Sequence, residues 1–257
     1  MINTTFDNQT EPLITPESFY GKHEKICDVC VITFSEKVME WALAHLPCEK
    51  VAEIGCCNGN RPIYLTEWKG QKIAFYMTLI SSSGAANCLE EARCLIGCSQ
   101  YILFGSCGTL EAQMTNGKLI VPTDAYRDEG LSYHYLPAED YIALENWEKV
   151  ADYLKDNAIA YVTGRTWTTD AIYRETAGKA EKLRNEGCIC VEMEVAGVQA
   201  VCKHHGLQLY NFLFASDCLG ETEWHNDLLG SEQEWDTQIK CFTVAMDLAV
   251  IVNRHGE

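Results

Sequence analysis

The sequence predicts one α/β domain in which helices cover both faces of a largely parallel or mixed central β-sheet. Short apolar, β-branched runs alternate along the chain with longer segments whose apolar residues recur at helical spacing. The 257 residues are 47% hydrophobic, which is ample for a substantial buried core. No Pro-, Ser- or Gly-rich linker divides the chain, so we expect a single domain over residues 1–257, with residues 1–25 as an irregular N-terminal arm.

The first regular elements follow this arm. Residues 26–32, ICDVCVI, predict a buried strand because the run is short, apolar and β-branched. Residues 35–46 predict a helix, since Ser35 is a suitable N-cap and Pro47 prevents continuation.

A hairpin and a second helix are expected next. Residues 64–80 predict two strands joined by a turn at Lys69 and Gly70. Residues 84–98 carry apolar side chains at helical spacing, and the serines at 81–83 precede the N-terminus of this helix.

The second half of the chain alternates between strand and helix patterns. Apolar runs predict strands at residues 101–108, 117–126, 159–164, 188–193 and 209–217. Helical periodicity covers residues 146–157, 176–187, 194–206 and 232–252. His204 and His205 are expected at an exposed helix end.

Charge and composition exclude several classes of partner. The formal net charge of −17 argues against binding to a nucleic-acid backbone or to an anionic membrane surface. No apolar run reaches the roughly 20 residues needed to span a bilayer, and the polar N-terminus is not typical of a signal peptide. We therefore expect a cytoplasmic protein.

The 14 cysteines are expected to be reduced, because the chain is long and carries no secretion signal. Only Cys27 and Cys30 have the spacing of metal ligands. A zinc site needs two more ligands, and no second CxxC or HxxxH pattern supplies them. We therefore predict buried thiols and no metal.

The segment VAEIGCCNGNRP, residues 51–62, resembles a strand followed by the glycine loop of a nucleotide cofactor site, as in methyltransferases that bind S-adenosylmethionine. Such a loop needs glycine where the backbone approaches the ligand, and here the middle position is Cys57. The following strand also lacks an acidic residue for the ribose hydroxyls. The cofactor-loop interpretation is therefore weak.

Polar residues gather where predicted strands end, which is the usual ligand-binding edge of an α/β sheet. Five segments lie in the order seen in the nucleoside phosphorylase family, which the chain resembles over most of its length: FGSCGTL, RDEGLSYHYLP, TWTTDAIYRE, VEMEVAGV and ASD. This family includes purine nucleoside phosphorylases, uridine phosphorylases and nucleosidases. The resemblance implies an α/β fold, no cofactor and inorganic phosphate as co-substrate.

Two carboxylates are candidates for the chemistry. Cleavage of an N-glycosidic bond builds positive charge on the ribose and negative charge on the base, so the site needs an anion near the sugar and an acid near the base. The resemblance implies that Glu194 binds the ribose hydroxyls, that Met193 lies against the sugar, and that Asp217 protonates a purine base. The alternatives are a carboxylate at a helix N-terminus for Glu194 and a capping residue for Asp217.

Other contacts also follow from the resemblance. Ser106 corresponds to a residue that touches phosphate or sugar. Ile172 occupies a position at which relatives often stack an aromatic ring on the base, and Tyr173 and Arg174 would lie near the base edge. A surface turn is the alternative for this last segment.

The phosphate site departs from the family pattern. The glycine-aspartate-proline loop is replaced by VITFSEK, with Lys37 about where its arginine would be, and Leu103 replaces a second arginine. Arg61 corresponds loosely to an arginine supplied by a neighbouring subunit. Phosphate could instead be held by Ser106, Lys37, Arg61 and the helix N-terminus at Ser83, because first-turn amides attract anions.

The sequence therefore predicts an enzyme that splits a nucleoside into free base and ribose 1-phosphate. A hydrolase that uses water and a non-catalytic nucleoside-binding protein are the alternatives. The resemblance also implies a homo-oligomer, either a dimer or a trimer of dimers.

Overall fold

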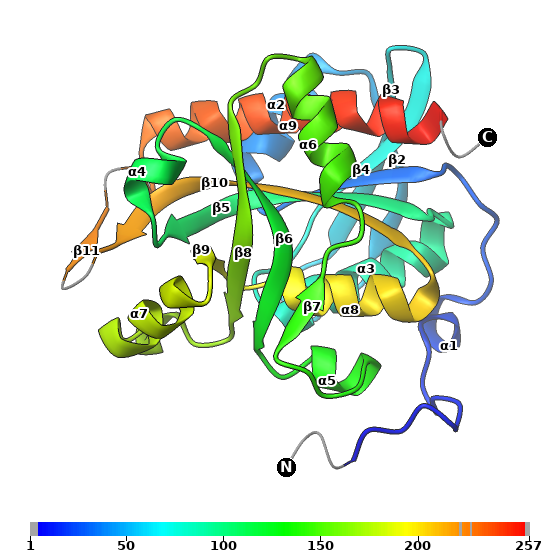
Figure 1. Cartoon of the computed structure of the whole chain (residues 1–257). Coiled ribbons are helices and arrows are strands. Elements are labelled where there is room, and N and C mark those ends of the chain that lie inside the picture. The colour runs from blue at the N-terminus through cyan, green and yellow to red at the C-terminus, as the bar shows by residue number, and fades with distance from the viewer. Residues whose placement is uncertain (1–4, 221–222, 227, 255–257) are drawn as a thin grey trace.

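A mixed β-sheet forms the centre of the molecule, and α-helices lie on both of its faces (Figure 1). The structure is a computed structural model that describes residues 5–220, 223–226 and 228–254. Its strands are β1 (Val29–Thr33), β2 (Cys48–Ile54), β3 (Arg61–Trp68), β4 (Gln71–Met77), β5 (Gln100–Thr109), β6 (Leu119–Asp128), β7 (Tyr141–Ala143), β8 (Tyr161–Thr169), β9 (Cys188–Glu192), β10 (Gln208–Leu219) and β11 (Trp224–His225).

Part of the sheet is closed into a ring of strands, whereas the rest is open. Within the described residues the order is β11-β10-β6-β8-β9-β5-β1-β4-β3-β2, with β7 paired to β6. Because β10 also pairs with β5, the strands β5, β10, β6, β8 and β9 form a closed ring. The parallel strands β1, β5 and β10 therefore end on the same side of the sheet.

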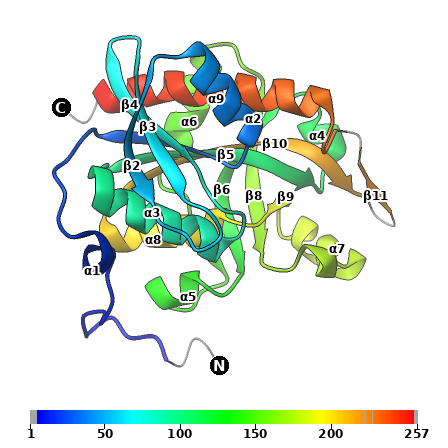
Figure 2. The same ribbon diagram turned by 180° about the vertical axis from the view of Figure 1, so that it is seen from behind.

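Helices cover the sheet in two groups. The helices are α1 (Pro16–Tyr20), α2 (Glu36–His45), α3 (Ser82–Ile96), α4 (Ala112–Thr115), α5 (Ser132–Tyr135), α6 (Trp147–Asp156), the 3-10 helix η2 (Ile172–Arg174), α7 (Ala177–Asn185), α8 (Val195–His205) and α9 (Glu232–Arg254). Helices α2, α6 and α9 pack on one face, around a core that includes Phe75, Phe104 and Phe212. Helices α3 and α8 pack on the other, as the view from behind shows (Figure 2).

The structure confirms the predicted α/β class, and each predicted strand or helix overlaps an observed one. Ser35 caps α2 as expected, because its Oγ accepts a hydrogen bond from the amide of Val38 at 3.3 Å. Lys69 and Gly70 both have positive φ, at 50° and 80°, and form the tight turn between β3 and β4. The unpredicted elements are all short ones: α1, α4, α5, η2, β7 and β11.

The cofactor-loop interpretation of residues 51–62 is wrong. Strand β2 pairs with β3 in an antiparallel hairpin, and residues 55–60 form its loop. A nucleotide-binding glycine loop needs a strand that leads into a helix whose N-terminus faces the phosphates. The strand here leads into another strand instead.

Cys27 and Cys30 pack in the core. Both are at most 5% exposed, and the Cys27 thiol lies 3.4 Å from that of Cys98. No set of three His, Cys, Asp or Glu side chains in the described part of the chain is arranged to bind a metal. None of the helices in the same residues is long and apolar enough to cross a membrane.

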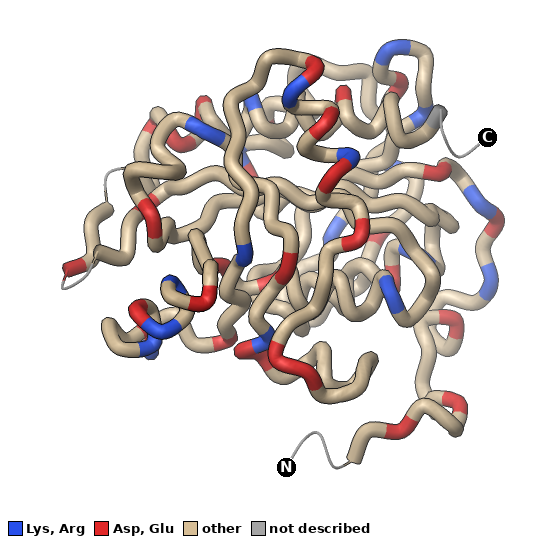
Figure 3. The backbone as a smooth tube through the Cα atoms, in the orientation of Figure 1, with Lys and Arg blue, Asp and Glu red and all other residues tan. Residues whose placement is uncertain are grey.

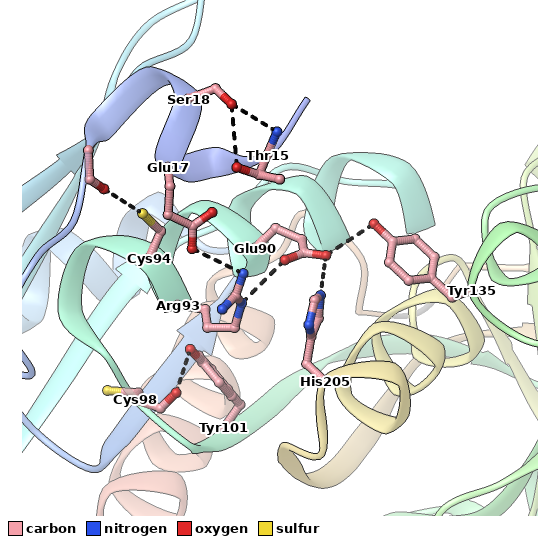
Figure 4. Close-up of polar contacts among 11 residues, drawn as sticks. Thr15, Glu17, Ser18, Glu90, Arg93, Cys94, Cys98, Tyr101, Tyr135 and His205 are labelled. Carbon is pink, nitrogen blue, oxygen red and sulfur yellow. Dashed lines mark hydrogen bonds and ion pairs between the residues drawn. The ribbon is translucent and has the colours of Figure 1, made fainter. Parts of the chain in front are cut away.

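Charged residues are spread over the whole fold, and acidic positions outnumber basic ones (Figure 3). One partly buried cluster joins α3 to the end of α8 (Figure 4). Glu90 on α3 accepts hydrogen bonds from His205 Nε2 at 2.6 Å and from the Tyr135 hydroxyl at 3.2 Å. Arg93 Nε lies 3.4 Å from the same carboxylate. His205 is therefore a partner of α3, and it is not the exposed helix end that the sequence indicates.

Candidate active site

A cavity of about 480 Å³ lies where β5, β9 and β10 end, beside η2 and β11. It brings together residues from separate parts of the sequence, among them Ser106 of β5, Glu194 after β9 and Asp217 of β10. Phe34, directly after β1, and Ile80, before α3, complete this edge. A cavity of this size is typical of a small-molecule site.

The pairing of β5 with β10 shapes the cavity wall. The register shifts between Ala215 and Asp217, so a bulge at Ser216 re-aims the end of β10. Gly108 of β5 is the partner of Asp217. A Cβ atom on Gly108 would lie 2.7 Å from Leu219 Cδ1, so the close approach of the two strands requires glycine here.

Glu194 occupies the N-cap position of α8 and is only 8% exposed. Its Oε1 accepts a hydrogen bond from the amide of Ser81 at 2.7 Å. Burial, and then the neighbouring charge of Glu192, raise the pKa of Glu194 from 4.5 to about 8. Met193 lies next to it in the cavity wall.

Glu192 fixes the segment that carries Glu194. Its Oε2 accepts hydrogen bonds at 2.7 Å from the amides of Glu194 and Val195, and its Oε1 accepts hydrogen bonds from the hydroxyls of Thr166 and Thr168. These donors satisfy both oxygens of a carboxylate that is 6% exposed. The first glutamate of VEMEVAG therefore holds the start of α8, whereas the second faces the cavity.

Asp217 accepts two hydrogen bonds at the cavity wall. Its Oδ1 accepts from Ser216 Oγ at 2.9 Å, and its Oδ2 accepts from the indole Nε1 of Trp224 at 2.7 Å. Trp224 itself is 57% exposed and, with Leu229, lines the cavity.

Glu175 is a cavity residue that the sequence reasoning did not single out. It follows η2 and lines the same cavity as Asp217. Burial, and then the negative charge of Asp217, raise the pKa of Glu175 from 4.5 to about 7. In the sequence it is one glutamate before a helix, and no local pattern distinguishes it from a residue that stabilises a helix N-terminus.

The structure brings some of the predicted base contacts to the cavity. Ile172 and Tyr173 line it, and they are 49% and 96% exposed. Arg174, the next residue of η2, is exposed and is not among the lining residues. Helix η2 thus contributes the exposed side chains of Ile172 and Tyr173 to the cavity lining.

The predicted phosphate contacts are more dispersed. Ser106 lines the cavity. Ser83 is exposed on the first turn of α3. Ile80, which precedes the N-cap residue of this helix, also lines the cavity. Lys37 is on α2, where it binds Glu40 at 2.8 Å, away from the cavity lining. Arg61 is on β3, also outside the lining, and its Nε is buried without a hydrogen-bond partner.

The described part of the cavity lining is apolar and acidic. Among the described residues that line the cavity there is no lysine or arginine, whereas Glu175, Glu192, Glu194 and Asp217 all line it. Leu103 is buried in the core. The Phe34 ring packs on Gly105, where an added Cβ would lie 3.1 Å from it.

Comparison with known proteins identifies the class. The sequence model of the phosphorylase superfamily matches residues 28–246, and the chain therefore belongs to this superfamily. The prediction of a nucleoside phosphorylase family member is thereby confirmed.

Individual relatives are distant. The chain is 27% identical to a guanosine phosphorylase of Halorubrum lacusprofundi over 160 residues, which are 61% of this chain and 66% of that protein. It is 21% identical over 203 residues to a DeoD-type purine nucleoside phosphorylase of Bacillus cereus, covering 77% of this chain and 85% of the relative. The structure of an AMP nucleosidase from Bacteroides thetaiotaomicron superposes with a TM-score of 0.68 at 18% identity, over 90% of each chain, and shows the same fold.

Proposed function

We propose that this protein cleaves the N-glycosidic bond of a nucleoside by phosphorolysis, giving free base and ribose 1-phosphate, and is thus a pentosyltransferase. The observation that carries the proposal is the meeting of Glu194 and Asp217 in one cavity of about 480 Å³. The names of the relatives, purine nucleoside and guanosine phosphorylases, support the reaction class.

Glu194 is assigned to the ribose. As the glycosidic bond breaks, positive charge develops on the sugar, and an adjacent carboxylate stabilises it. Burial favours the neutral acid in the empty site, but ribose hydroxyls that donate to Glu194 would favour its ionised form. Ribose binding is therefore expected to release a proton from Glu194. Met193 would contact the sugar, and Ser106 the sugar or phosphate.

The base is assigned to the other part of the cavity. Ile172 and Tyr173 offer apolar surface for a base ring, and Arg174 follows them at the rim. Asp217 would lie beside the base nitrogen that is protonated as the bond breaks. A purine is favoured over uracil because both phosphorylase relatives are named for purine nucleosides.

Phosphate would bind near Ser106 and the first turn of α3 at Ser83, where helix amides favour an anion. The cations Lys37 and Arg61 complete the proposed set. Lys37 would first have to leave its exposed ion pair with Glu40. Arg61 would act on the site of a neighbouring copy, in a dimer or a trimer of dimers.

We further propose a cytoplasmic role in nucleoside salvage, without a cofactor. Buried free thiols, such as those of Cys107 and Cys190, suit a reducing compartment.

Hydrolysis is the second candidate, and the cavity lining favours it. Water needs no positive charge to bind, and the described lining residues include carboxyl groups but no lysine or arginine. The similarity in fold to an AMP nucleosidase accords with this candidate. A non-catalytic nucleoside-binding protein is a third possibility, against which the joint presence of Glu194 and Asp217 counts.

A product assay separates these functions. The protein is incubated with a panel of purine nucleosides and uridine, with and without phosphate, and the sugar product is analysed. Ribose 1-phosphate formed only with phosphate supports phosphorolysis. Free ribose, released at an unchanged rate without phosphate, would replace this proposal with hydrolysis, and binding without cleavage would remove the enzymatic function.

A further inference from the structure

Glu175 and Asp217 bring two carboxyl groups to the same cavity from separate parts of the chain. Glu175 lies between β8 and α7, whereas Asp217 lies on β10. Asp217 accepts hydrogen bonds on both oxygens, from Ser216 Oγ and Trp224 Nε1. The Glu175 carboxyl makes no hydrogen bond or ion pair with any other described residue.

The hydrogen-bond partners locate the proton of this pair. An indole N–H can only donate, so Asp217 Oδ2 acts as the acceptor and carries no proton. Because both of its oxygens accept hydrogen bonds, we take Asp217 as the anion of the pair. Burial and the charge of this anion raise the pKa of Glu175 from 4.5 to about 7, so about half of the Glu175 carboxyl groups carry a proton at pH 7. Two nearby carboxyl groups with different environments are the usual arrangement of an acid and its ionised neighbour.

We propose, on the basis of the function proposed above, that Glu175 is the catalytic acid that gives its proton to the departing base, while Asp217 remains ionised beside it. The bond between the ribose C1′ and the base nitrogen breaks, and its electron pair passes to the base. The Glu175 O–H bond breaks, an N–H bond forms on the base, and Glu175 becomes a carboxylate. Phosphate oxygen forms the new bond to C1′, and solvent returns the proton to Glu175 before the next turnover.

Other charged groups around Glu175 are engaged elsewhere or act on the sugar. On α7, Lys179 binds Asp128 and Arg184 lies 3.7 Å from Glu111. Across the cavity, Glu192 is held by hydroxyls and amides, and Glu194 accepts from the Ser81 amide. Arg174 precedes Glu175 in the chain and is exposed. Within the described residues, Asp217 is thus the anion that acts on Glu175, and Glu194 is the other cavity carboxyl that titrates near neutrality.

The first test is the pH dependence of kcat/KM for a purine nucleoside in the full-length protein. The wild type needs Glu194 ionised and Glu175 protonated, so its rate should rise toward about pH 7 and fall above about pH 8. Glu175→Gln should lower kcat about 100-fold at pH 7 and abolish the fall at high pH. Phosphate titrates equally in both reactions, so the difference between the two profiles isolates Glu175.

Matched variants complete this test. Glu175→Asp, which keeps an acid, should restore part of the rate and the fall at high pH. Asp217→Asn removes the charge that helps to keep Glu175 protonated, so the rise should move to lower pH and the maximal kcat/KM should fall. Glu181→Gln, on the exposed face of α7, should leave the profile unchanged.

The second test uses nitrophenyl riboside, whose leaving group needs no proton. Glu175→Gln should cleave this substrate within about threefold of the wild-type rate, because only the acid has been removed. Equal losses on both substrates, or a wild-type pH profile in Glu175→Gln, would overturn the role of Glu175 while leaving the proposed function intact. Absence of cleavage of either substrate by the wild type would overturn the proposed function and this role together.

Discussion

The buried Glu194 and the partly buried Glu90 are both glutamates associated with α8, yet their surroundings shift their pKa values in opposite directions. Glu194 is at the N-terminus of α8 beside the cavity, with its pKa raised to about 8 by burial and then by Glu192. Glu90 contacts the other end of α8 through His205, and its side chain is 12% exposed. Burial alone would raise the pKa of Glu90, but hydrogen bonds and charges from His205, Arg93 and Tyr135 lower it below 4.5.

The difference between the two glutamates shows how a structural carboxylate differs from one that is ready to bind a ligand. Glu90 has cationic and hydroxyl partners that stabilise its ionised form and join α3 to α8 (Figure 4). Glu194 has the Ser81 amide but no cation among the described residues that line the cavity. Its unfavourable burial can be relieved by a ligand that donates hydrogen bonds, which is the property expected of an active-site group.

The largest expected effect is on Glu194. Glu194→Gln keeps the shape and the acceptor for Ser81 but removes the negative charge, so kcat for nucleoside cleavage should fall about 100-fold or more. The same change in Glu148, exposed in the first turn of α6, is the matched control and should leave kcat unaltered. Near-normal turnover in Glu194→Gln would remove the assignment.

Glu194→Gln should also change stability in a pH-dependent way. The folded-state pKa of about 8 lies above the ordinary 4.5, so the folded protein loses stability as pH rises from about 4.5 through about 8. Replacing Glu194 removes this loss. The variant should therefore have a higher Tm than the wild type at pH 9 and a similar Tm at pH 4.5, as measured by calorimetry. A lower Tm at pH 9 would contradict the account of its burial.

Asp217→Asn should have the next largest effect. We expect a loss of about 10-fold to 100-fold in kcat with a purine nucleoside and little loss with nitrophenyl riboside, because Asp217 acts by keeping Glu175 protonated, and protonation of the base matters only for a poor leaving group. Steady-state kinetics on the two substrates measure the ratio. Equal losses would instead point to a structural role, such as anchoring Trp224.

The phosphate contacts should show a smaller effect, confined to phosphate. Arg61→Ala should raise the KM for phosphate about tenfold, and Lys37→Ala about twofold to threefold, because Lys37 already has Glu40 as partner. The KM for the nucleoside should stay the same in both variants. Unchanged phosphate KM in both would exclude these cations from the site and would strengthen the case for hydrolysis.

His205→Ala should have the smallest effect on turnover and a clear effect on stability. It leaves the Glu90 carboxylate without its closest partner, which should cost about 1–3 kcal/mol of unfolding free energy while kcat stays within about twofold. Because the pKa of Glu90 is lowered, this stabilisation is present at neutral pH and is lost as pH falls through the folded-state value. Chemical denaturation at pH 7 and pH 4 measures both.

His204→Ala is the control, since the adjacent imidazole makes ring contacts but no ion pair in the described residues. A large loss of turnover in His205→Ala would show that the two ends of α8 are coupled. Glu90 would then contribute to catalysis and would not have a purely structural role.

The order of strands and helices could be predicted because its signals are local. Ser35 caps α2 by accepting a hydrogen bond from the amide of Val38, three residues along the chain. The turn at Lys69 and Gly70 joins two strands that are adjacent in sequence. The segment VEMEVAG placed Glu194 at the junction of β9 and α8 for the same reason. Such signals depend on hydrogen bonds and periodicity within a few residues, which the sequence displays directly.

The amino-acid sequence by itself determined the α/β class, the segment order and the family. Tertiary structure alone decided which charges share the cavity. Pairing of β5 with β10 brings Ser106 to Asp217, folding of η2 brings Glu175 to the same wall, and Lys37 lies away from it on α2. The partnership of His205 with Glu90 was likewise decided by the packing of α8 on α3. Both the set of carboxyl groups in the cavity and the pairing of His205 with Glu90 depend on segments that are distant in the sequence. These segments bury a side chain and place charges beside it only when the whole chain is folded.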